Sequence, residues 1–227
     1  MTIEKFTKKF KELKKKGFVK SHRKGPTGIG HTLEQELGMK ENNIALPDIK
    51  GAELKAHRMS HKGMITLFTF NNKCWVMKPL TAVKKYGSKD KDGRMGLYYT
   101  MSLKPNSAGL FLDIEDEKIS VRHKSGELIV NWDLERLSKR FEQKIPALIL
   151  VSAETEERDG IEYFKFTNAR LLKGTSPELL HEQFGLQNIL VDLRLHDKGT
   201  MARNHGTGFR AFENKLIYLF KESIIIA

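Results

Sequence analysis

The sequence predicts a mixed α/β protein, because stretches with a helical apolar period alternate with stretches whose apolar residues recur at every second position. Its 227 residues are enough for one large domain or for two lobes that share a core. Apolar residues make up 39% and charged residues 30%, a balance typical of a folded chain and not of a disordered one. We therefore expect helices and strands arranged in two lobes.

The N-terminal part is predicted to alternate short helices and strands. Residues 2–16 form an amphipathic helix, because Phe6, Phe10 and Leu13 share one face. A basic, glycine-rich loop over residues 22–30 follows this helix. The further elements expected here are a helix from Thr32 to Gly38, strands over 52–56 and 64–70, a helix over 76–86 and a charged turn over 88–94.

From Leu97 onward the pattern favours strands joined by short polar turns. Asp133 is expected to cap a helix that runs to about Glu142, and Ser176 begins another short helix. The strands expected before residue 196 are 97–103, 108–114, 117–123, 127–132, 145–153, 161–172 and 189–195. A loop over 196–206 is expected next, followed by a strand over 207–212, a short helix and a last strand over 223–226.

Charge and cysteine content restrict the partner and the compartment. Forty Lys and Arg against twenty-eight Asp and Glu give a net charge of +12, which favours a polyanion, with nucleic acid ahead of an anionic membrane. A single cysteine, Cys74, excludes an internal disulfide framework and a cysteine-rich zinc site. No apolar run approaches the roughly 20 residues of a membrane span, and the lysine-rich N-terminus does not resemble a signal peptide. We expect a cytoplasmic protein that binds nucleic acid; an inert basic surface is the alternative.

The candidate catalytic residues are Asp48, Glu53 and Lys55. On a strand, Glu53 and Lys55 project from the same face, and Gly51 lets the chain fold Asp48 back beside Glu53. Two converging carboxylates suit Mg²⁺, and a neighbouring lysine can orient a water molecule and offset charge at phosphorus. The alternative is a solvated Glu–Lys pair on an exposed strand face.

The Glu-x-Lys tripeptide is weak by itself, since it also occurs at residues 12–14, 142–144 and 213–215. Those three copies fall on predicted helices, where side chains two positions apart diverge by about 200°. Glu34, on the helix after the glycine-rich loop, is a fourth candidate, although a carboxylate near a helix start is also favoured by the helix dipole.

The run of residues 23–34, followed by Pro47-Asp48 and Glu53-Leu54-Lys55, resembles the MvaI/BcnI family of type II restriction endonucleases. It is more distantly similar to the MutH-type mismatch-repair nicking endonucleases. Further segments agree with the family in the same order along the chain, at residues 66–69, 86–90, 152–154 and 205–210. The resemblance therefore spans the chain from about Gly17 to its C-terminus. The resemblance implies a PD-(D/E)xK restriction-endonuclease-like core, a mixed sheet flanked by helices, in two lobes that clasp DNA.

The resemblance also implies a Mg²⁺ cofactor and a set of residue roles. Asp48 and Glu53 bind the metal, Lys55 serves the attacking water, and Glu34 belongs to the catalytic motif, which thus spans 34–55. Such enzymes act as monomers on double-stranded DNA at short CC-x-GG sites. A companion DNA methyltransferase that acts on the same site is a further candidate partner.

The residues expected to contact DNA are Asp192, Arg194, Arg203, His205 and Arg210 at the bases, and Arg23 and Lys24 at phosphates. Arginine can bind guanine O6 and N7 together, and aspartate can accept from cytosine N4. Asp192 and Arg194 share a strand face, although a surface ion pair would explain this pair equally well. Arg203 stands where the family has a histidine, which leaves the recognised base sequence open.

The sequence therefore predicts a Mg²⁺-dependent, site-specific endonuclease of double-stranded DNA. Residues 1–95 are expected to form mainly the catalytic lobe, and residues 96–227 the remaining sheet and the recognition lobe. A mismatch-repair nicking endonuclease and a non-catalytic DNA-binding module are the two alternatives.

Overall fold

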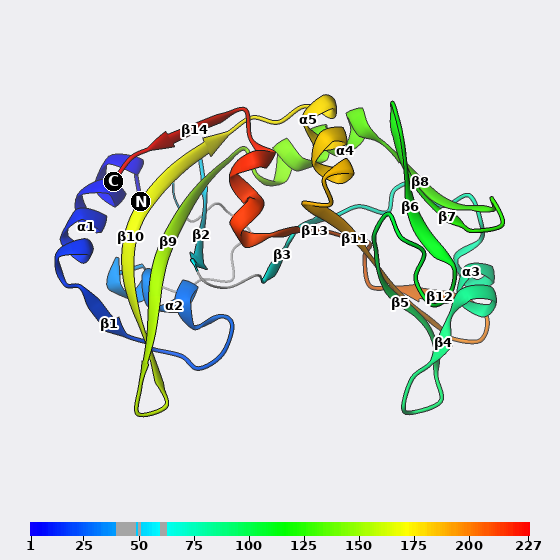
Figure 1. Cartoon of the computed structure of the whole chain (residues 1–227), viewed down its shortest axis with the longest axis horizontal. Helices are drawn as coiled ribbons and strands as arrows, with labels where there is room; N and C mark the ends of the chain where they lie inside the picture. The colour runs from blue at the N-terminus through cyan, green and yellow to red at the C-terminus, as the bar shows by residue number, and fades with distance from the viewer. Residues whose placement is uncertain (40–48, 50, 60–62) are drawn as a thin grey trace. The chain divides into compact units, whose positions relative to one another are not determined.

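The computed structural model describes residues 1–39, 49, 51–59 and 63–227, which form two compact units (Figure 1). The first unit comprises Met1–Gly63, Ile145–Gly174 and Phe220–Ala227, and the second comprises Met64–Lys144 and Thr175–Leu219. Because these five segments alternate along the chain, it passes between the units four times. The domain boundary expected near residue 95 lies within the second unit. Each unit is held together by pairing between strands that are distant in the sequence, so no single position in the chain separates the units.

The first unit is built on a five-stranded sheet made of β1 (Phe18–Lys20), β2 (Glu53–Arg58), β9 (Ala147–Arg158), β10 (Ile161–Lys173) and β14 (Glu222–Ile225). Its order is β1-β10-β9-β2, and β14 also pairs with β10. Strand β2 runs parallel to β9, whereas the other neighbours are antiparallel. The sheet is therefore mixed, as the predicted nuclease core requires.

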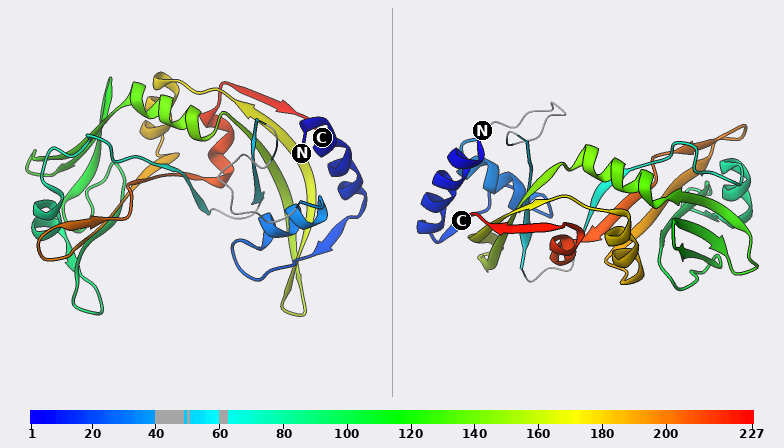
Figure 2. Two further views of the ribbon diagram at one scale, coloured as in Figure 1. Left: turned by 180° about the vertical axis from the view of Figure 1, so that it is seen from behind. Right: turned by 90° about the horizontal axis from the view of Figure 1, so that it is seen from above.

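Two helices, α1 (Ile3–Lys15) and α2 (Gly28–Glu36), cover one face of this sheet (Figures 1 and 2). Helix α1 confirms the predicted amphipathic pattern, because Phe6, Phe10 and Leu13 are its buried residues. They share a core with α2 and with the apolar face of the sheet. This core fixes which face of β2 points inward and which points outward.

Helix α2 begins at Gly28, so the prediction that Thr32 starts this helix is wrong. Thr32 lies inside the helix and is fully buried, and its hydroxyl accepts a hydrogen bond from the backbone N–H of His22 at 3.0 Å. Ile29 and Leu33, one helical turn apart, are both buried in the core. Because Ile29 and Leu33 pack on the same side of the helix, the helix includes Gly28 and Gly30, which were predicted to lie in a loop.

The second unit contains a six-stranded antiparallel sheet and a three-stranded sheet. The larger sheet consists of β3 (Met64–Thr69), β4 (Ser88–Lys89), β5 (Met95–Met101), β11 (Ile189–Asp197), β12 (Ala202–Asn204) and β13 (Gly208–Phe212). Its order is β3-β13-β11-β5-β4, with β12 also on β11. The smaller sheet is formed by β6 (Leu110–Glu115), β7 (Lys118–His123) and β8 (Leu128–Asp133).

The helices of the second unit are α3 (Pro79–Tyr86), α4 (Leu134–Lys144), α5 (Pro177–Gly185) and the 3₁₀ helix η1 (Glu213–Leu219). The predicted cap of α4 at Asp133 and the predicted start of α5 near Ser176 are confirmed. The side chain of Asp133 accepts from Arg136 N at 2.9 Å, and that of Ser176 accepts from Leu179 N at 3.2 Å. Among the described residues, no helix combines the length and apolar character needed to cross a membrane.

Strand β11 alternates strictly between a buried and a polar face. Val191, Leu193 and Leu195 are fully buried, whereas the residues between them are polar. Phe209 anchors the neighbouring strand β13, because its ring stacks on Phe68 with the centroids 4.9 Å apart. The larger sheet therefore buries one face in the unit and presents the other as a polar surface.

Candidate active site and nucleic-acid interface

Glu53 and Lys55 project together from β2, as the strand pattern predicts. Leu54 between them is buried in the core of the first unit, while Glu53 and Lys55 keep 34% and 29% of their side chains exposed. The Lys55 Nζ lies 3.4 Å from Glu53 Oε1. This separation is long for an ion pair, so the pair stays open to a ligand. The copies of Glu-x-Lys near residues 12, 142 and 213 lie on α1, α4 and η1, as expected.

A tight turn directly precedes β2. Ile49 and Ala52 exchange two backbone hydrogen bonds of 3.1 and 2.8 Å, both residues are fully buried, and Gly51 adopts a positive φ of 84°. The chain therefore reverses just before Glu53. Asp48, the predicted partner of Glu53, lies outside the described residues, so their meeting stays a prediction.

The donor chemistry on β2 fits a hard divalent cation. The Glu53 carboxylate is an oxygen ligand of the kind Mg²⁺ prefers, and it is accessible. Within residues 1–39, 49, 51–59 and 63–227, no cluster of three or more His, Cys, Asp or Glu could hold a metal ion by itself. Mg²⁺ usually keeps several waters and takes only one or two protein carboxylates, which fits a site built on Glu53.

Arg58 ties β2 to the glycine-rich loop. Its Nε and Nη2 donate to the two carboxylate oxygens of Glu162 on β10 at 2.6 and 2.8 Å, and its Nη1 donates to the carbonyl of Pro26 at 3.1 Å. Such a two-pronged pair holds both partners in one geometry. The loop before α2 is thus fixed to the strand that carries Glu53. Glu34 lies half-buried on α2, which packs against β2, and its catalytic role stays a prediction.

His57 follows Lys55 on the same face of β2 and is nearly buried. Its Nε2 lies 2.8 Å from the Ser152 hydroxyl, and its Nδ1 has no partner among the described residues. Burial lowers the pKa of His57 below its ordinary value of 6.5, against a smaller raising effect of the backbone at Arg58. This histidine therefore sits beside the candidate catalytic pair in its neutral form.

The lowered pKa of His57 predicts a loss of stability in acid. Because the unfolded chain takes up the proton more readily, the free energy of unfolding should be constant well above pH 6.5 and decrease as the pH falls below that value. Denaturant titrations between pH 5 and pH 8 measure this slope. His57→Gln, which keeps an amide near Ser152, should flatten the slope relative to the wild type. A slope in His57→Gln equal to that of the wild type would contradict the assignment.

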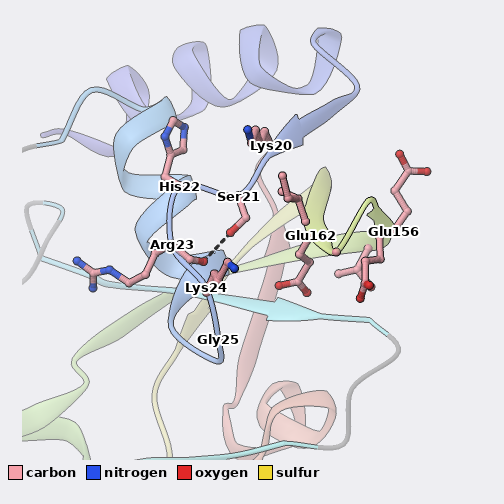
Figure 3. Close-up of a pocket in the computed structure, with 12 residues that line it drawn as sticks. Lys20, Ser21, His22, Arg23, Lys24, Gly25, Glu156 and Glu162 are labelled. Carbon is pink, nitrogen blue, oxygen red and sulfur yellow. Dashed lines mark hydrogen bonds between the residues drawn. The ribbon is translucent and has the colours of Figure 1, made fainter.

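Arg23 and Lys24 lie in the loop that lines one side of a surface pocket of about 620 Å³ (Figure 3). The Ser21 hydroxyl donates to the carbonyl of Arg23 at 2.7 Å and shapes the loop. The other side is formed by the β9–β10 hairpin with Glu156 and Glu162. The Arg23 guanidinium points away from these carboxylates (Figure 3). A phosphate contact by Arg23 and Lys24 stays a prediction.

The candidate base-contacting residues gather on the polar face of the larger sheet in the second unit. Asp192 pairs with Gly208 and Leu190 with Arg210 between β11 and β13, and His196 pairs with Arg203 on β12. His205 continues this arrangement, since its N–H donates to the carbonyl of Arg194 at 2.9 Å. Paired residues of an antiparallel sheet share a face. We name this surface the reading face; its residues are Asp192, Arg194, His196, Arg203, His205 and Arg210.

Asp192 and Arg210 are held together on the reading face. Asp192 Oδ2 accepts from Arg210 Nη1 at 3.0 Å, and Oδ1 accepts from the Thr100 hydroxyl at 2.7 Å. Arg210 Nη2 also donates to the carbonyl of Met64 at 3.1 Å. Asp192 is only 8% exposed, so both of its oxygens are committed within the protein. Arg210 is consequently presented in a fixed orientation, with Asp192 as its support.

The position of the Arg194 guanidinium depends on the absence of a side chain at Gly208. A Cβ at position 208 would lie 2.3 Å from Arg194 Nη2, so the guanidinium occupies the space that only glycine leaves. Within the part of the chain that the structure describes, Arg194 forms no ion pair. Its guanidinium is thus not committed to a carboxylate, in contrast to the supported guanidinium of Arg210.

Sequence analysis did not identify Thr100, His196 or Gly208. His196 could have been found, because it continues the alternation of Asp192 and Arg194 by two residues. Thr100 and Gly208 carry no signal of their own, since their roles depend on which strands pair with β11 and in which register.

Comparison with known proteins agrees with this geometry. The sequence matches the MvaI/BcnI restriction endonuclease family over residues 7–220. A solved complex of restriction endonuclease MvaI with cognate DNA substrate has a TM-score of 0.72 and 26% identity, covering 100% of both chains. The structure of MvaI in the absence of DNA has a TM-score of 0.64 and 25% identity, covering 99% of this chain and 97% of that one. No curated protein matches the sequence. The predicted fold class is thereby confirmed.

Proposed function

The chain belongs to the MvaI/BcnI restriction endonuclease family, and from this membership we propose that it is a Mg²⁺-dependent type II enzyme that cuts both strands of DNA at a short, GC-rich, CC-x-GG-like site. The observation that carries the proposal is the reading face, which gathers every residue assigned to base contacts on one side of one sheet. A strand ribbon of this kind fits the major groove, where each base pair has its own donor and acceptor pattern.

We assign the chemistry to the exposed side of β2. Glu53, together with Asp48, would hold the cation, and the bound ion supplies Lewis-acid charge next to the scissile phosphate. Lys55, 3.4 Å from the Glu53 carboxylate, keeps its ammonium group on the same face. From there it can orient a water molecule for in-line attack and offset the negative charge that grows on the phosphate oxygens. The tie of Arg58 to Glu162 holds this strand in place.

Three arginines support a site rich in G·C pairs. Arg194, Arg203 and Arg210 all lie on the reading face, and arginine pairs with guanine O6 and N7 more often than with any other base edge. Arg210 is oriented by Asp192 before DNA arrives, which reduces the side-chain entropy lost on binding. We expect at least two of these arginines to contact guanines.

Gly208→Ala should weaken sequence discrimination without unfolding the protein. The added Cβ meets only the flexible end of Arg194, at 2.3 Å, and therefore displaces the guanidinium while the backbone stays in place. Loss of one bidentate contact corresponds to about 1–3 kcal/mol of discrimination. Binding to the target duplex and to single-base-pair variants of it measures this loss.

Gly185→Ala, at the end of α5, is the matched control for Gly208→Ala. A Cβ at position 185 has no neighbour within 4 Å, so this variant should keep both stability and discrimination. Full discrimination in Gly208→Ala would remove Arg194 from the base-contacting set.

The proposed function is tested by digestion of a plasmid of known sequence with Mg²⁺ and sequencing of the ends. Linear products with ends at one short, recurring GC-rich sequence support it. Persistent open circles would instead identify a nicking enzyme of the mismatch-repair type, and an unchanged plasmid that is still bound would identify a non-catalytic DNA-binding module. EDTA should stop all cleavage, because the reaction depends on the divalent ion.

We further propose that the enzyme acts in the cytoplasm as a monomer beside a methyltransferase that modifies the same site. Sedimentation of the protein with a duplex that contains one site tests the stoichiometry, and 1:1 complexes are expected. The methyltransferase partner is tested by methylating the cut sequence before digestion, which should protect the plasmid from cleavage.

A further inference from the structure

Tyr98, His196 and His205 form a hydrogen-bonded cluster on the reading face. His196 Nδ1 lies 3.1 Å from the Tyr98 hydroxyl and 3.0 Å from His205 Nε2. The two imidazole rings stack with their centroids 5.0 Å apart and an interplanar angle of 28°. One nitrogen atom of His196 is thus shared between two neighbours.

The sheet places these three side chains together. His196 lies two residues beyond Arg194 on β11, and it pairs with Gly96 on β5. The ring of Tyr98 lies over Gly96, because a Cβ at position 96 would be 2.5 Å from its Cε2 atom. Tyr98 therefore bends back along β5 toward His196, although half of its surface remains exposed.

The shared nitrogen constrains the protons of the cluster. When His196 Nδ1 is an acceptor, Tyr98 O–H and His205 Nε2–H can both donate to it and share its single lone pair. When His196 Nδ1 carries the proton, its N–H can donate to Tyr98 or to His205, but not fully to both. The remaining neighbour then lacks a partner at His196. The first arrangement leaves an N–H donor on His196 Nε2 and an acceptor on His205 Nδ1.

The charges around His196 favour its neutral form, which this arrangement needs. Desolvation, and then nearby positive charges that include Lys198, Arg203 and Arg94, lower the pKa of His196 below its ordinary value. Arg203 comes from β12, Lys198 from the turn after β11 and Arg94 from the turn before β5, and Tyr98 faces the same histidine from β5.

We propose that His196 and His205 act as a coupled donor–acceptor pair that reads one base pair in the major groove, with Tyr98 as the positioning residue that selects their protons. The inference rests on the proposed function. Its ligand is a G·C pair, which presents guanine O6 as an acceptor beside cytosine N4 as a donor. Residues two apart on a strand lie about 6.6 Å from each other, so His196 lies beyond Arg194 along β11.

The experiment measures binding of the wild type, Tyr98→Phe, His196→Ala, His205→Ala and the double histidine variant to the target duplex in EDTA. A set of duplexes, each with one base pair replaced, provides the preference at every position. All three single variants should lose roughly five- to tenfold of the preference at one and the same G·C pair, as for a lost hydrogen bond. The double variant should lose little more than His205→Ala alone, because coupled residues are not additive.

Tyr218→Phe is the matched control, since Tyr218 and Tyr98 are equally exposed at 50%, and it should keep every preference. An equal loss of affinity for all duplexes in Tyr98→Phe and His196→Ala would overturn the inference, because it would indicate a structural or phosphate-binding role. Unchanged preferences in both variants would also overturn it and leave the proposed function intact. A wild type without any sequence preference would instead refute the proposed function itself.

Discussion

Lys55→Ala should lower the rate of plasmid cleavage by about 10²- to 10⁴-fold, the usual contribution of a positioned acid or base. The truncation removes the ammonium group that lies 3.4 Å from Glu53 on the exposed face of β2. It costs little stability, because a partly exposed pair of this kind contributes about 0–1 kcal/mol. Specific binding in EDTA should therefore remain close to that of the wild type, and single-turnover cleavage with Mg²⁺ measures the loss of rate.

The same sheet supplies a matched control for this variant. Lys165 on β10 lies 3.2 Å from Glu154 on β9, which reproduces the Glu–Lys pair at a place without a candidate metal ligand. Lys165→Ala should cleave at the wild-type rate. Full activity of Lys55→Ala would be incompatible with our assignment of the catalytic strand, and an equal defect in both variants would point to a general loss of charge or stability.

Arg210→Ala is expected to weaken discrimination at one G·C pair by about 1–3 kcal/mol, or roughly 5- to 150-fold. It removes a guanidinium that Asp192 and the carbonyl of Met64 hold in place before DNA binds. It also leaves the nearly buried Asp192 without its cation, so a loss of stability is expected in parallel. Thermal unfolding and binding to single-base-pair variants separate the two effects.

Two further variants make the test of Arg210 specific. Arg210→Lys keeps a positive charge near Asp192 but lacks the planar fork, so it should recover stability more than discrimination. Arg122 on β7 is likewise held by two carboxylates, Asp113 at 2.6 Å and Glu115 at 2.8 Å, but away from the reading face. Arg122→Ala should keep every base preference. An unchanged preference in Arg210→Ala would show that Arg210 is structural only.

Local patterns were sufficient for most helices and strands. The cap at Asp133, the start of α5 near Ser176 and the buried face of α1 depend on residues a few positions apart, and each was predicted correctly. The outward projection of Glu53 and Lys55 follows from alternation on a single strand. The short strands β1, β4 and β12 were missed, because they are too short to show a period and form only against their neighbours.

Features that depend on long-range pairing could not be predicted in this way. The sequence does not show that β2 lies parallel to β9, nor that Arg210 meets Asp192 across β11 and β13. Base contact by Asp192 was expected from its chemistry, whereas the structure commits both of its oxygens to Thr100 and Arg210.

The repeated passage of the chain between the units has a consequence during translation. Strand β2 acquires its partner β9 only when residues 147–158 have been synthesised, and β14 adds to the same sheet from residues 222–225. The segment 175–219, which carries β11 and β13, is made between these two events. A nascent polypeptide can therefore pair β2 with β9 before β11 and β13 are made, whereas β14 completes the sheet of the first unit only in a chain that already carries the reading face.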